Sequence, residues 1–248
     1  MTSGSADEPG RAVPFVPNVE NFSWCFSRPR PDGRYGRLQD VHESDPASAK
    51  RAVRQEILAL RRALPAAARA DADAAILTRL VAELRDCSVV AAYVPVGTEP
   101  GATEPGGADL PEALRRSGLE VLLPVLEPDG DLDWAVYDGR LEPAARGLRQ
   151  PPGPRRGRDA VARADAVIVP AVAVDRHGVR LGRGGGSYDR ALARLAPGIT
   201  GTVLLYEGEL VDVLPSEAHD RAVGTVITPT TVYRVPAGTR RTSTPSTG

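Results

Sequence analysis

The chain has 248 residues and a net charge of −1, because 31 Lys and Arg side chains nearly balance 32 Asp and Glu side chains. This balance argues against a nucleic acid or a membrane surface as the main partner. No stretch approaches the roughly 20 apolar residues that span a bilayer, the start of the chain lacks a secretory pattern, and two cysteines cannot make a disulfide framework. We therefore expect a cytoplasmic protein.

Composition divides the chain into three regions. Residues 1–45 combine prolines and scattered charges without a lasting hydrophobic period, which predicts a disordered N-terminal extension. Residues 46–235 carry the periodic apolar segments and are long enough for a single α/β domain with an ample core. Residues 236–248 are expected to form a disordered C-terminal tail.

The first helix is predicted over residues 46–64 and ends before Pro65; its apolar stripe at helical spacing is Val53, Ile57, Leu60 and Leu64. Lys50 and Arg54 lie one turn apart on a shared face of this helix. On spacing alone, a solvated basic face is the simpler interpretation of this pair. Arg61 and Arg62 are assigned to such a solvated face.

The rest of the domain alternates apolar runs with helical patterns. Runs rich in β-branched residues between helices are typical of a parallel sheet that is covered on both faces. We therefore predict a single-domain, three-layer αβα Rossmann-like fold with a mostly parallel central sheet. Helices are predicted over residues 66–85 and 111–117, and strands over 88–96, 120–125, 132–137, 166–174, 199–206 and 223–228.

Two residues beside the predicted strands are candidates for ligand contact. Glu99 follows the C-terminal end of the strand at 88–96, and ligands bind at that edge of open α/β sheets. A solvated loop glutamate is an equally good interpretation. Trp134, within the predicted strand at 132–137, could line a ligand pocket, although an aromatic side chain in a strand is more often part of the core.

A glycine-rich segment, residues 180–190, follows the apolar run at 166–174 and precedes a helical pattern that ends at Pro197. Four glycines between 182 and 186 allow positive φ angles and a close approach to a ligand. The start of a helix offers unpaired N–H groups, and Arg180 and Arg183 add forked donors, so we predict a phosphate site. No lysine follows the glycines, which excludes a P-loop.

The glycine-rich segment belongs to a longer string, Val174-Asp175-x-x-Gly178-x-Arg180-Leu181-Gly182-x-Gly184-x-Gly186-x-Tyr188-Asp189-Arg190. This string resembles the signature of the 5-formyltetrahydrofolate cyclo-ligases, also called methenyltetrahydrofolate synthetases. The likeness extends from about Lys50 to about Tyr233. Ser187 departs from the pattern, because the family usually has tyrosine there, and Gln150 replaces a glutamate.

The resemblance implies an ATP-dependent reaction that converts 5-formyltetrahydrofolate, with or without a polyglutamate tail, to 5,10-methenyltetrahydrofolate, ADP and phosphate. The γ-phosphoryl group first activates the formyl oxygen, and N10 of the folate then attacks the formyl carbon. Such a route needs alignment and charge stabilisation, and no protein nucleophile. Mg²⁺ is implied, and we expect a monomer. Arginines of the connector at 151–158 could meet the anionic tail or serve only solubility.

The resemblance also implies a set of site residues. Arg180, Arg183 and Tyr188 are implied as catalytic. ATP contacts are implied for Lys50, Arg54, Arg180, Leu181, Gly182, Arg183, Gly184, Gly185, Gly186, Ser187 and Tyr188. Folate contacts are implied for Val94, Glu99, Arg183, Gly184, Gly185, Gly186 and Ser187. Asp189 and Asp220 are implied as Mg²⁺ ligands, while a carboxylate at a helix start and a surface residue are their structural alternatives.

Two other functional classes stay open at this point. One is a different enzyme on a similar frame, such as a sugar-phosphate isomerase or an acyl-CoA transferase, which would need no ATP. The other is a binding module that holds nucleotide or folate without turnover. Consumption of ATP coupled to conversion of the folate distinguishes the cyclo-ligase from both.

Overall fold

The computed structural model describes residues 46–102, 109–216 and 221–236. The predicted extension at 1–45 lies outside these residues, as does the predicted tail at 236–248 except for Pro236. Asp220 also lies outside them.

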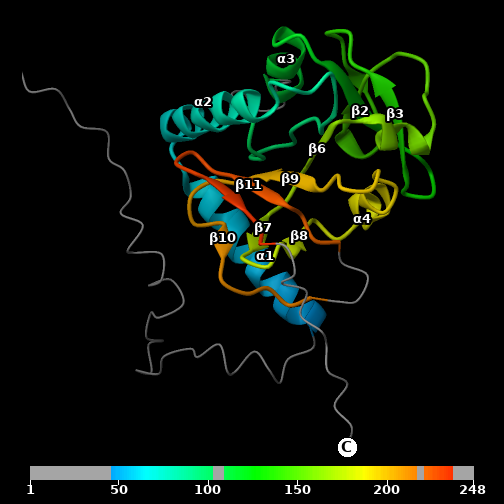
Figure 1. Ribbon diagram of the computed structural model, residues 1–248. Helices are drawn as coiled ribbons and strands as arrows, with labels where there is room; N and C mark the ends of the chain where they lie inside the picture. Colours follow the sequence, from blue (N-terminus) through cyan, green and yellow to red (C-terminus); the bar gives the residue numbers. More distant parts are fainter. Residues whose placement is uncertain (1–45, 103–108, 217–220, 237–248) are drawn as a thin grey trace, which may run out of the picture. The chain divides into compact units, whose positions relative to one another are not determined.

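A seven-stranded sheet forms the centre of the domain, in the order β12-β11-β9-β6-β1-β2-β3 (Figure 1). The strands from β11 to β2 are parallel, and antiparallel β3 and β12 form the two edges. The mostly parallel sheet is therefore confirmed. Its strands are β1 (Val89–Ala91), β2 (Glu120–Leu126), β3 (Leu132–Val136), β6 (Ala166–Val169), β9 (Gly201–Leu204), β11 (Thr225–Ile227) and β12 (Val232–Arg234).

Helices cover both faces of this sheet, as predicted. Side chains of α2 (Ala66–Glu83) and α3 (Asp109–Arg116) pack with one set of strand residues, which includes Val90 and Ile168. Side chains of α4 (Ser187–Leu192) and the 3₁₀ helix η4 (Arg158–Arg163) pack with the opposite set, which includes Val167. Neighbouring residues along β6 thus contribute to different faces, as the period of two in a strand requires.

The strand order places a change of direction in the middle of the sheet. The chain passes from β1 to β2 on one side, and later returns to β6 on the other side of β1. In open α/β sheets, ligands bind outside the carboxyl ends of the strands at such a point. The fold therefore predicts a site beyond the ends of β1 and β6.

The single strand predicted over 166–174 was wrong, because the structure divides it. β6 ends at Val169, and β7 (Ala173–Asp175) belongs to a small separate sheet with β8 (Arg180–Leu181) and β10 (Leu210–Val211). Pro170 lies at the break, and a proline has no N–H to donate to a strand ladder. The glycine-rich segment therefore begins in β8 of the β7–β8 hairpin and does not directly follow the central strand.

The small sheet brings the first helix to the glycine-rich segment. α1 (Pro46–Ala63) packs on this sheet through Ile57, which joins Ala173 and Leu181 in one apolar cluster. Most other predicted elements are present with shorter bounds, although β2 ends one residue later and α3 begins two residues earlier than predicted. β12 adds an edge strand outside β11. A further hairpin consists of β4 (Glu142–Pro143), the 3₁₀ turn η3 (Ala145–Gly147) and β5 (Arg149–Gln150).

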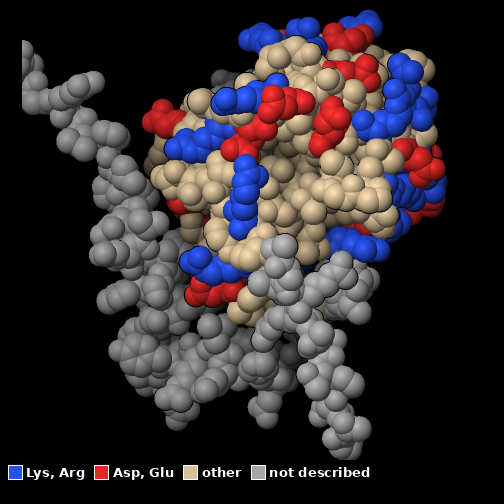
Figure 2. Space-filling model, in the orientation of Figure 1, with Lys and Arg blue, Asp and Glu red and all other residues tan. Residues whose placement is uncertain are grey.

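The surface shows no single dominant charge on the face that is drawn in Figure 2, where basic and acidic side chains are interspersed. This agrees with the near-neutral balance of the whole sequence. Within the described ranges, no helix combines the length and apolar character needed to cross a membrane.

Candidate active site

A cavity of about 610 Å³ opens beyond the carboxyl ends of β1, β2 and β6. Its wall contains every predicted site residue that the structure describes, although these residues come from distant parts of the chain. They are Lys50, Arg54, Val94, Glu99, Arg180, Leu181, Gly182, Arg183, Gly184, Gly185, Gly186, Ser187, Tyr188 and Asp189. Trp134 does not line the cavity and is fully buried, so its core assignment is confirmed.

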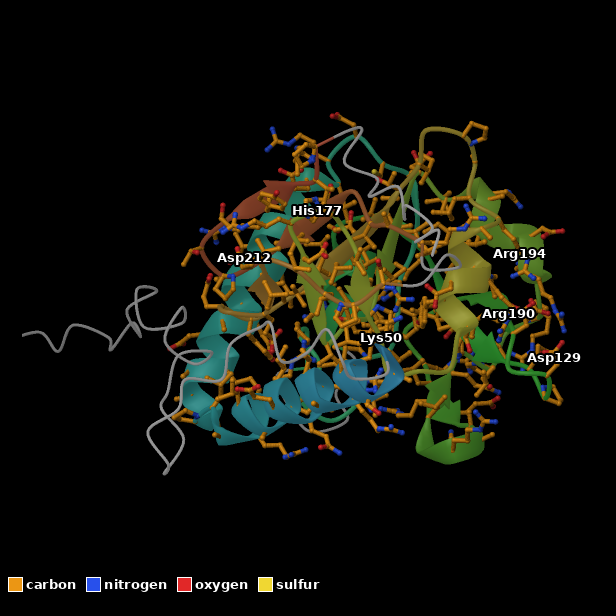
Figure 3. All side chains as sticks on the ribbon, turned by 90° about the horizontal axis from the view of Figure 1, so that it is seen from below. Lys50, Asp129, His177, Arg190, Arg194 and Asp212 are labelled. Atoms are coloured by element: carbon orange, nitrogen blue, oxygen red, sulfur yellow. The ribbon has the colours of Figure 1, made fainter. Side chains whose placement is uncertain are left out.

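The glycine-rich loop is tied to α1 at its first residue. Arg54 Nε donates to the main-chain oxygen of Gly182 at 2.9 Å. Gly184 and Gly186 have φ angles of 99° and 67°, which glycine adopts without strain. α4 follows at once but has only six residues, so its contribution as a helix terminus is smaller than the sequence suggested. Figure 3 shows Lys50 near the start of α1.

Arg180 connects the small sheet to α4 at the cavity wall. Its guanidinium donates to Asp189 Oδ1 at 2.8 Å and to the main-chain oxygen of Pro170 at 3.1 Å. Its Nε is buried without a hydrogen-bond partner among the described residues. A buried cation that keeps an unused donor beside a cavity is suited to an incoming anion.

Glu99 and Arg183 form an ion pair between the loop after β1 and the glycine-rich loop. Arg183 Nε lies 3.0 Å from Glu99 Oε1, and Val96 N–H donates to Glu99 Oε2 at 2.9 Å. The Glu99 side chain is only 8% exposed. Burial raises the pKa of Glu99 above its ordinary value, although the nearby charge of Arg183 opposes this effect.

Two tyrosines stand beside this ion pair in the cavity. Tyr93 donates its hydroxyl to the main-chain oxygen of Pro100 at 2.7 Å, and this contact braces the loop that carries Glu99. Tyr188 is the second residue of α4. Burial, with a smaller contribution from Glu99, raises the pKa of Tyr188 well above its ordinary value. Tyr188 therefore stays protonated and can act as a hydrogen-bond donor.

Comparisons with known proteins identify the family of the chain. The sequence profile of the 5-formyltetrahydrofolate cyclo-ligase family matches residues 46–229. The chain belongs to this family. A 5-formyltetrahydrofolate cyclo-ligase of Mycolicibacterium smegmatis is 39% identical over 188 residues, which cover 73% of this chain and 94% of the relative.

Similarity to two further proteins, one in sequence and one in structure, supports this family membership. A 5-formyltetrahydrofolate cyclo-ligase of Escherichia coli K12 is 37% identical over 127 residues, which cover 49% of this chain and 70% of the relative. The solved 5,10-methenyltetrahydrofolate synthetase of Aquifex aeolicus superposes with a TM-score of 0.63 at 26% identity, and the match covers 76% of this chain and 94% of that chain. The fold and the family thus agree.

The magnesium ligands predicted for this cyclo-ligase stay a prediction. Asp189 lies at the cavity wall with Oδ1 bound to Arg180. Asp220 is outside the described residues. Across ranges 46–102, 109–216 and 221–236, no group of three or more His, Cys, Asp or Glu side chains could hold a metal ion.

The solvated basic face assigned to Arg61 was wrong. The Arg61 side chain is 1% exposed and donates to both carboxylate oxygens of Glu209, at 2.5 and 2.7 Å. Leu60, which the predicted apolar stripe included, is 41% exposed. The helix is thus rotated relative to the predicted stripe, so that Arg61 lies one turn after Ile57 on the buried side. Arg62 is exposed as predicted.

The hairpin β4–β5 supplies cavity residues that sequence reasoning missed. Arg146 and Arg149 both line the cavity, and Arg146 is the one non-glycine residue with a positive φ, 60°, in the described part of the chain. Such a conformation is uncommon outside glycine and occurs where a turn must aim a side chain. The sequence did contain a signal for this hairpin, because the segment Gly147-Leu148-Arg149-Gln150-Pro151 resembles a Gly-Ile-x-Glu-Pro turn of the family.

Proposed function

We propose that this protein catalyses the ATP-dependent conversion of 5-formyltetrahydrofolate to 5,10-methenyltetrahydrofolate, with release of ADP and phosphate. One observation carries the proposal: the anion-binding groups of the glycine-rich loop and the buried carboxylate of Glu99 face the same cavity. A reaction between a triphosphate and a folate needs both kinds of group in one place. Membership of the cyclo-ligase family supports this assignment.

In the proposed complex, Lys50, Arg54 and the loop at 182–186 bind the triphosphate, while Val94 and Glu99 bind the folate. The formyl oxygen attacks the γ-phosphorus, and the bond from that phosphorus to ADP breaks. N10 then attacks the formyl carbon, and the oxygen leaves with the phosphate. Arg180 and Arg183 stabilise the negative charge of the transferring group, and Tyr188 donates a hydrogen bond.

Asp189 is suited to a Mg²⁺ ion that accompanies the nucleotide. It lies at the cavity wall, and no hydrogen bond from a described residue engages its Oδ2. Mg²⁺ commonly takes one or two carboxylates together with phosphate oxygens and water, so Asp189 with Asp220 would hold it. When bound, the ion would offset the charge of the phosphates.

The anionic tail of a polyglutamylated folate could be met by Arg146 and Arg149 of the β4–β5 hairpin, since both line the cavity. The connector at 151–158 is less suited, because its arginines do not line the cavity and Arg158 is paired with Asp129 and Asp131. A monomeric enzyme in the cytoplasm stays a prediction from the sequence.

The test uses the full chain with ATP, Mg²⁺ and 5-formyltetrahydrofolate, and follows the absorbance of the methenyl product together with ADP. We expect one ADP for each product molecule and no product without ATP. A folded protein that forms no product would contradict the proposal. Tight binding of both substrates without turnover would indicate the binding module.

Replacing Lys50 by alanine is expected to raise KM for ATP by about 10- to 100-fold, because one charge-assisted phosphate contact is lost. KM for the folate should change by less than about threefold. Steady-state kinetics with each substrate varied in turn measure both values. Arg51→Ala is the control, because Arg51 is exposed on the same helix and contacts Ser48.

Lys50 is also the only lysine of the chain, which gives a direct check of its position. An amine-reactive reagent followed by peptide mass spectrometry should label Lys50, and ATP should slow this labelling. Equal labelling with and without ATP, or an unchanged KM for ATP in Lys50→Ala, would contradict the assignment.

A further inference from the structure

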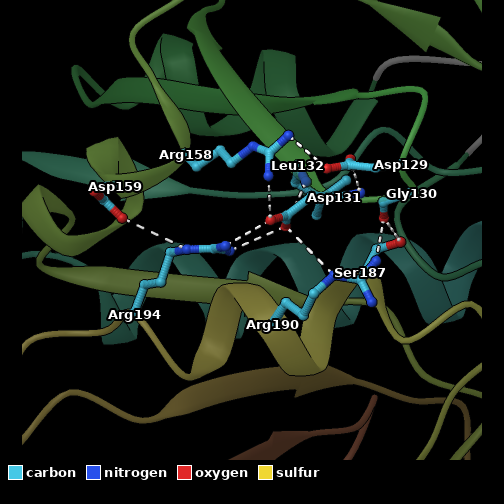
Figure 4. A network of polar contacts seen from close by, with 9 residues as sticks. All are labelled: Asp129, Gly130, Asp131, Leu132, Arg158, Asp159, Ser187, Arg190 and Arg194. Carbon is cyan, nitrogen blue, oxygen red and sulfur yellow. Dashed lines mark hydrogen bonds and ion pairs between the residues drawn. The ribbon is translucent and has the colours of Figure 1, made fainter.

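The turn between β2 and β3, residues 127–131, is fastened to α4 by a group of charged and polar contacts (Figure 4). We propose that this turn anchors the C-terminal end of the glycine-rich loop, with Ser187, Arg190 and Arg194 as positioning residues for phosphoryl transfer. The inference rests on the proposed function for its catalytic consequence. The anchoring itself stands on the contacts described below.

The first contact is made by the main-chain oxygen of Gly130. It accepts a hydrogen bond from Ser187 Oγ at 2.5 Å and another from Arg190 Nη2 at 2.5 Å. Ser187 directly follows Gly186, so this bond holds the chain where the glycines end. The hydroxyl of Ser187, at the position where the family usually has tyrosine, is therefore engaged by the protein and serves to hold the loop.

The second contact is made by Asp131, whose side chain is 5% exposed. Arg194 donates to both of its carboxylate oxygens, at 3.0 and 2.5 Å, and Arg190 Nε lies 3.6 Å away. Arg158 reaches the same carboxylate from η4 at 3.2 Å. Figure 3 shows Arg190, Arg194 and Asp129 together beside α4. A buried carboxylate with these partners fixes α4 more firmly than an exposed ion pair would.

The turn itself is well defined, so it can serve as a fixed support. Glu127 N–H donates to the oxygen of Asp131 at 2.9 Å, and Gly130 N–H donates to that of Glu127 at 2.9 Å. Asp129 Oδ1 accepts the N–H of Asp131 at 3.0 Å. The arginines, Arg194 foremost, hold the pKa of Asp131 at about 2, so the anchor stays charged at neutral pH.

These contacts matter to the cavity for two reasons. Leu126 and Leu132 flank the turn and line the cavity, as do Tyr188 and Asp189 of α4, so the same contacts set the distance between these walls. The loop is also held at its other end by the bond from Arg54 to Gly182. A segment with four glycines loses much backbone entropy when it orders, and two anchors reduce what ATP must supply.

The experiment compares two arginines that bind the same carboxylate. Arg194→Gln removes the contact from the turn that follows α4, whereas Arg158→Gln removes the contacts of η4 with Asp129 and Asp131 and leaves α4 untouched. Ser187→Ala removes the bond to Gly130, and Ser187→Thr keeps a hydroxyl. Hydrogen exchange of a peptide that covers residues 182–186 is measured in the ligand-free protein, and kcat and both KM values are measured with ATP and 5-formyltetrahydrofolate.

We expect Arg194→Gln and Ser187→Ala to speed exchange of the loop by about five- to tenfold and to lower kcat by about tenfold. Arg158→Gln should stay within about twofold of the parent protein in exchange and in kcat, and Ser187→Thr should leave exchange of the loop within about twofold of the parent value. Equal effects of Arg194→Gln and Arg158→Gln, or unchanged loop exchange in Ser187→Ala, would overturn the inference. Exchange needs no turnover, so an inactive parent protein would refute the proposed function and leave the anchor tested.

Discussion

Replacing Arg61 by methionine is expected to lower the free energy of unfolding by about 3–5 kcal/mol, the range for removing one partner of a buried ion pair. The guanidinium is almost fully buried and binds both oxygens of Glu209. It also donates to the main-chain oxygens of Ala171 and Val172, just after β6. The variant loses these bonds and leaves a buried carboxylate without its cation. Urea unfolding measures the change.

Two further variants separate the ion pair from general damage to α1. Arg62→Met, on the exposed side of the same helix, should change the free energy of unfolding by less than about 0.5 kcal/mol. Arg61→Met combined with Glu209→Leu should recover most of the loss, because apolar side chains often replace a buried ion pair at little cost. If Arg61→Met were as stable as Arg62→Met, the buried pair would contribute nothing.

The loss in Arg61→Met should also depend on pH. Burial raises the pKa of Glu209, while Arg61 lowers it, so removal of Arg61 raises that pKa further. A carboxyl with a folded-state pKa above its unfolded value favours folding at low pH, and this contribution is lost as pH rises through the folded-state pKa. The destabilisation is therefore expected to be smaller near pH 5 than near pH 8.

Arg61 shows what the sequence could predict and what it could not. The residue lies four positions after Ile57, a spacing compatible with the buried face, but the predicted stripe ran through Leu60, and the charge of Arg61 assigned it to the solvated face. Its partner Glu209 is 148 positions away and is brought beside it by the fold. No local pattern contains that pairing. The spacing of Arg61 from Ile57 was nevertheless a usable signal.

For the predicted strand at 166–174, the local sequence contained the signal that was missed. Its β-branched residues correctly predicted a central strand, and Pro170 within the run was the signal for its end. The cavity position of the residues between 180 and 189 was predictable because the long glycine motif is specific in residue type and spacing, while the roles implied for them stay predictions. The support of the loop by residues 127–131 could not be predicted, because it depends on how the β2–β3 turn packs against α4 in three dimensions.

Replacing Glu99 by glutamine is expected to lower kcat/KM for 5-formyltetrahydrofolate by about 10- to 100-fold, because a hydrogen bond to a charged group becomes a weaker neutral one. KM for ATP should change by less than about threefold. Steady-state kinetics provide both values. Glu112→Gln is the control, since Glu112 pairs with Arg115 and Arg116 on the surface of α3 and lines no part of the cavity.

The effect of Glu99→Gln on stability distinguishes a carboxylate that binds the substrate from one that supports the loop. Burial raises the pKa of Glu99, so its ionised form opposes folding as pH rises through that pKa. Glutamine removes this cost, and Arg183 is about half exposed and stays solvated. We therefore expect Glu99→Gln to be at least as stable as the parent protein near pH 8, although its activity is lower.

The pH dependence of activity should be opposite in sign to the contribution of Glu99 to stability. If the ionised form of Glu99 binds the folate, kcat/KM of the parent protein falls as pH decreases through the raised pKa, at a higher pH than an ordinary glutamate would cause. Glu99→Gln should lack this acidic limb. An acidic limb that persists in the variant, or a stability loss that matches the activity loss, would show that Glu99 supports the loop and does not bind the substrate.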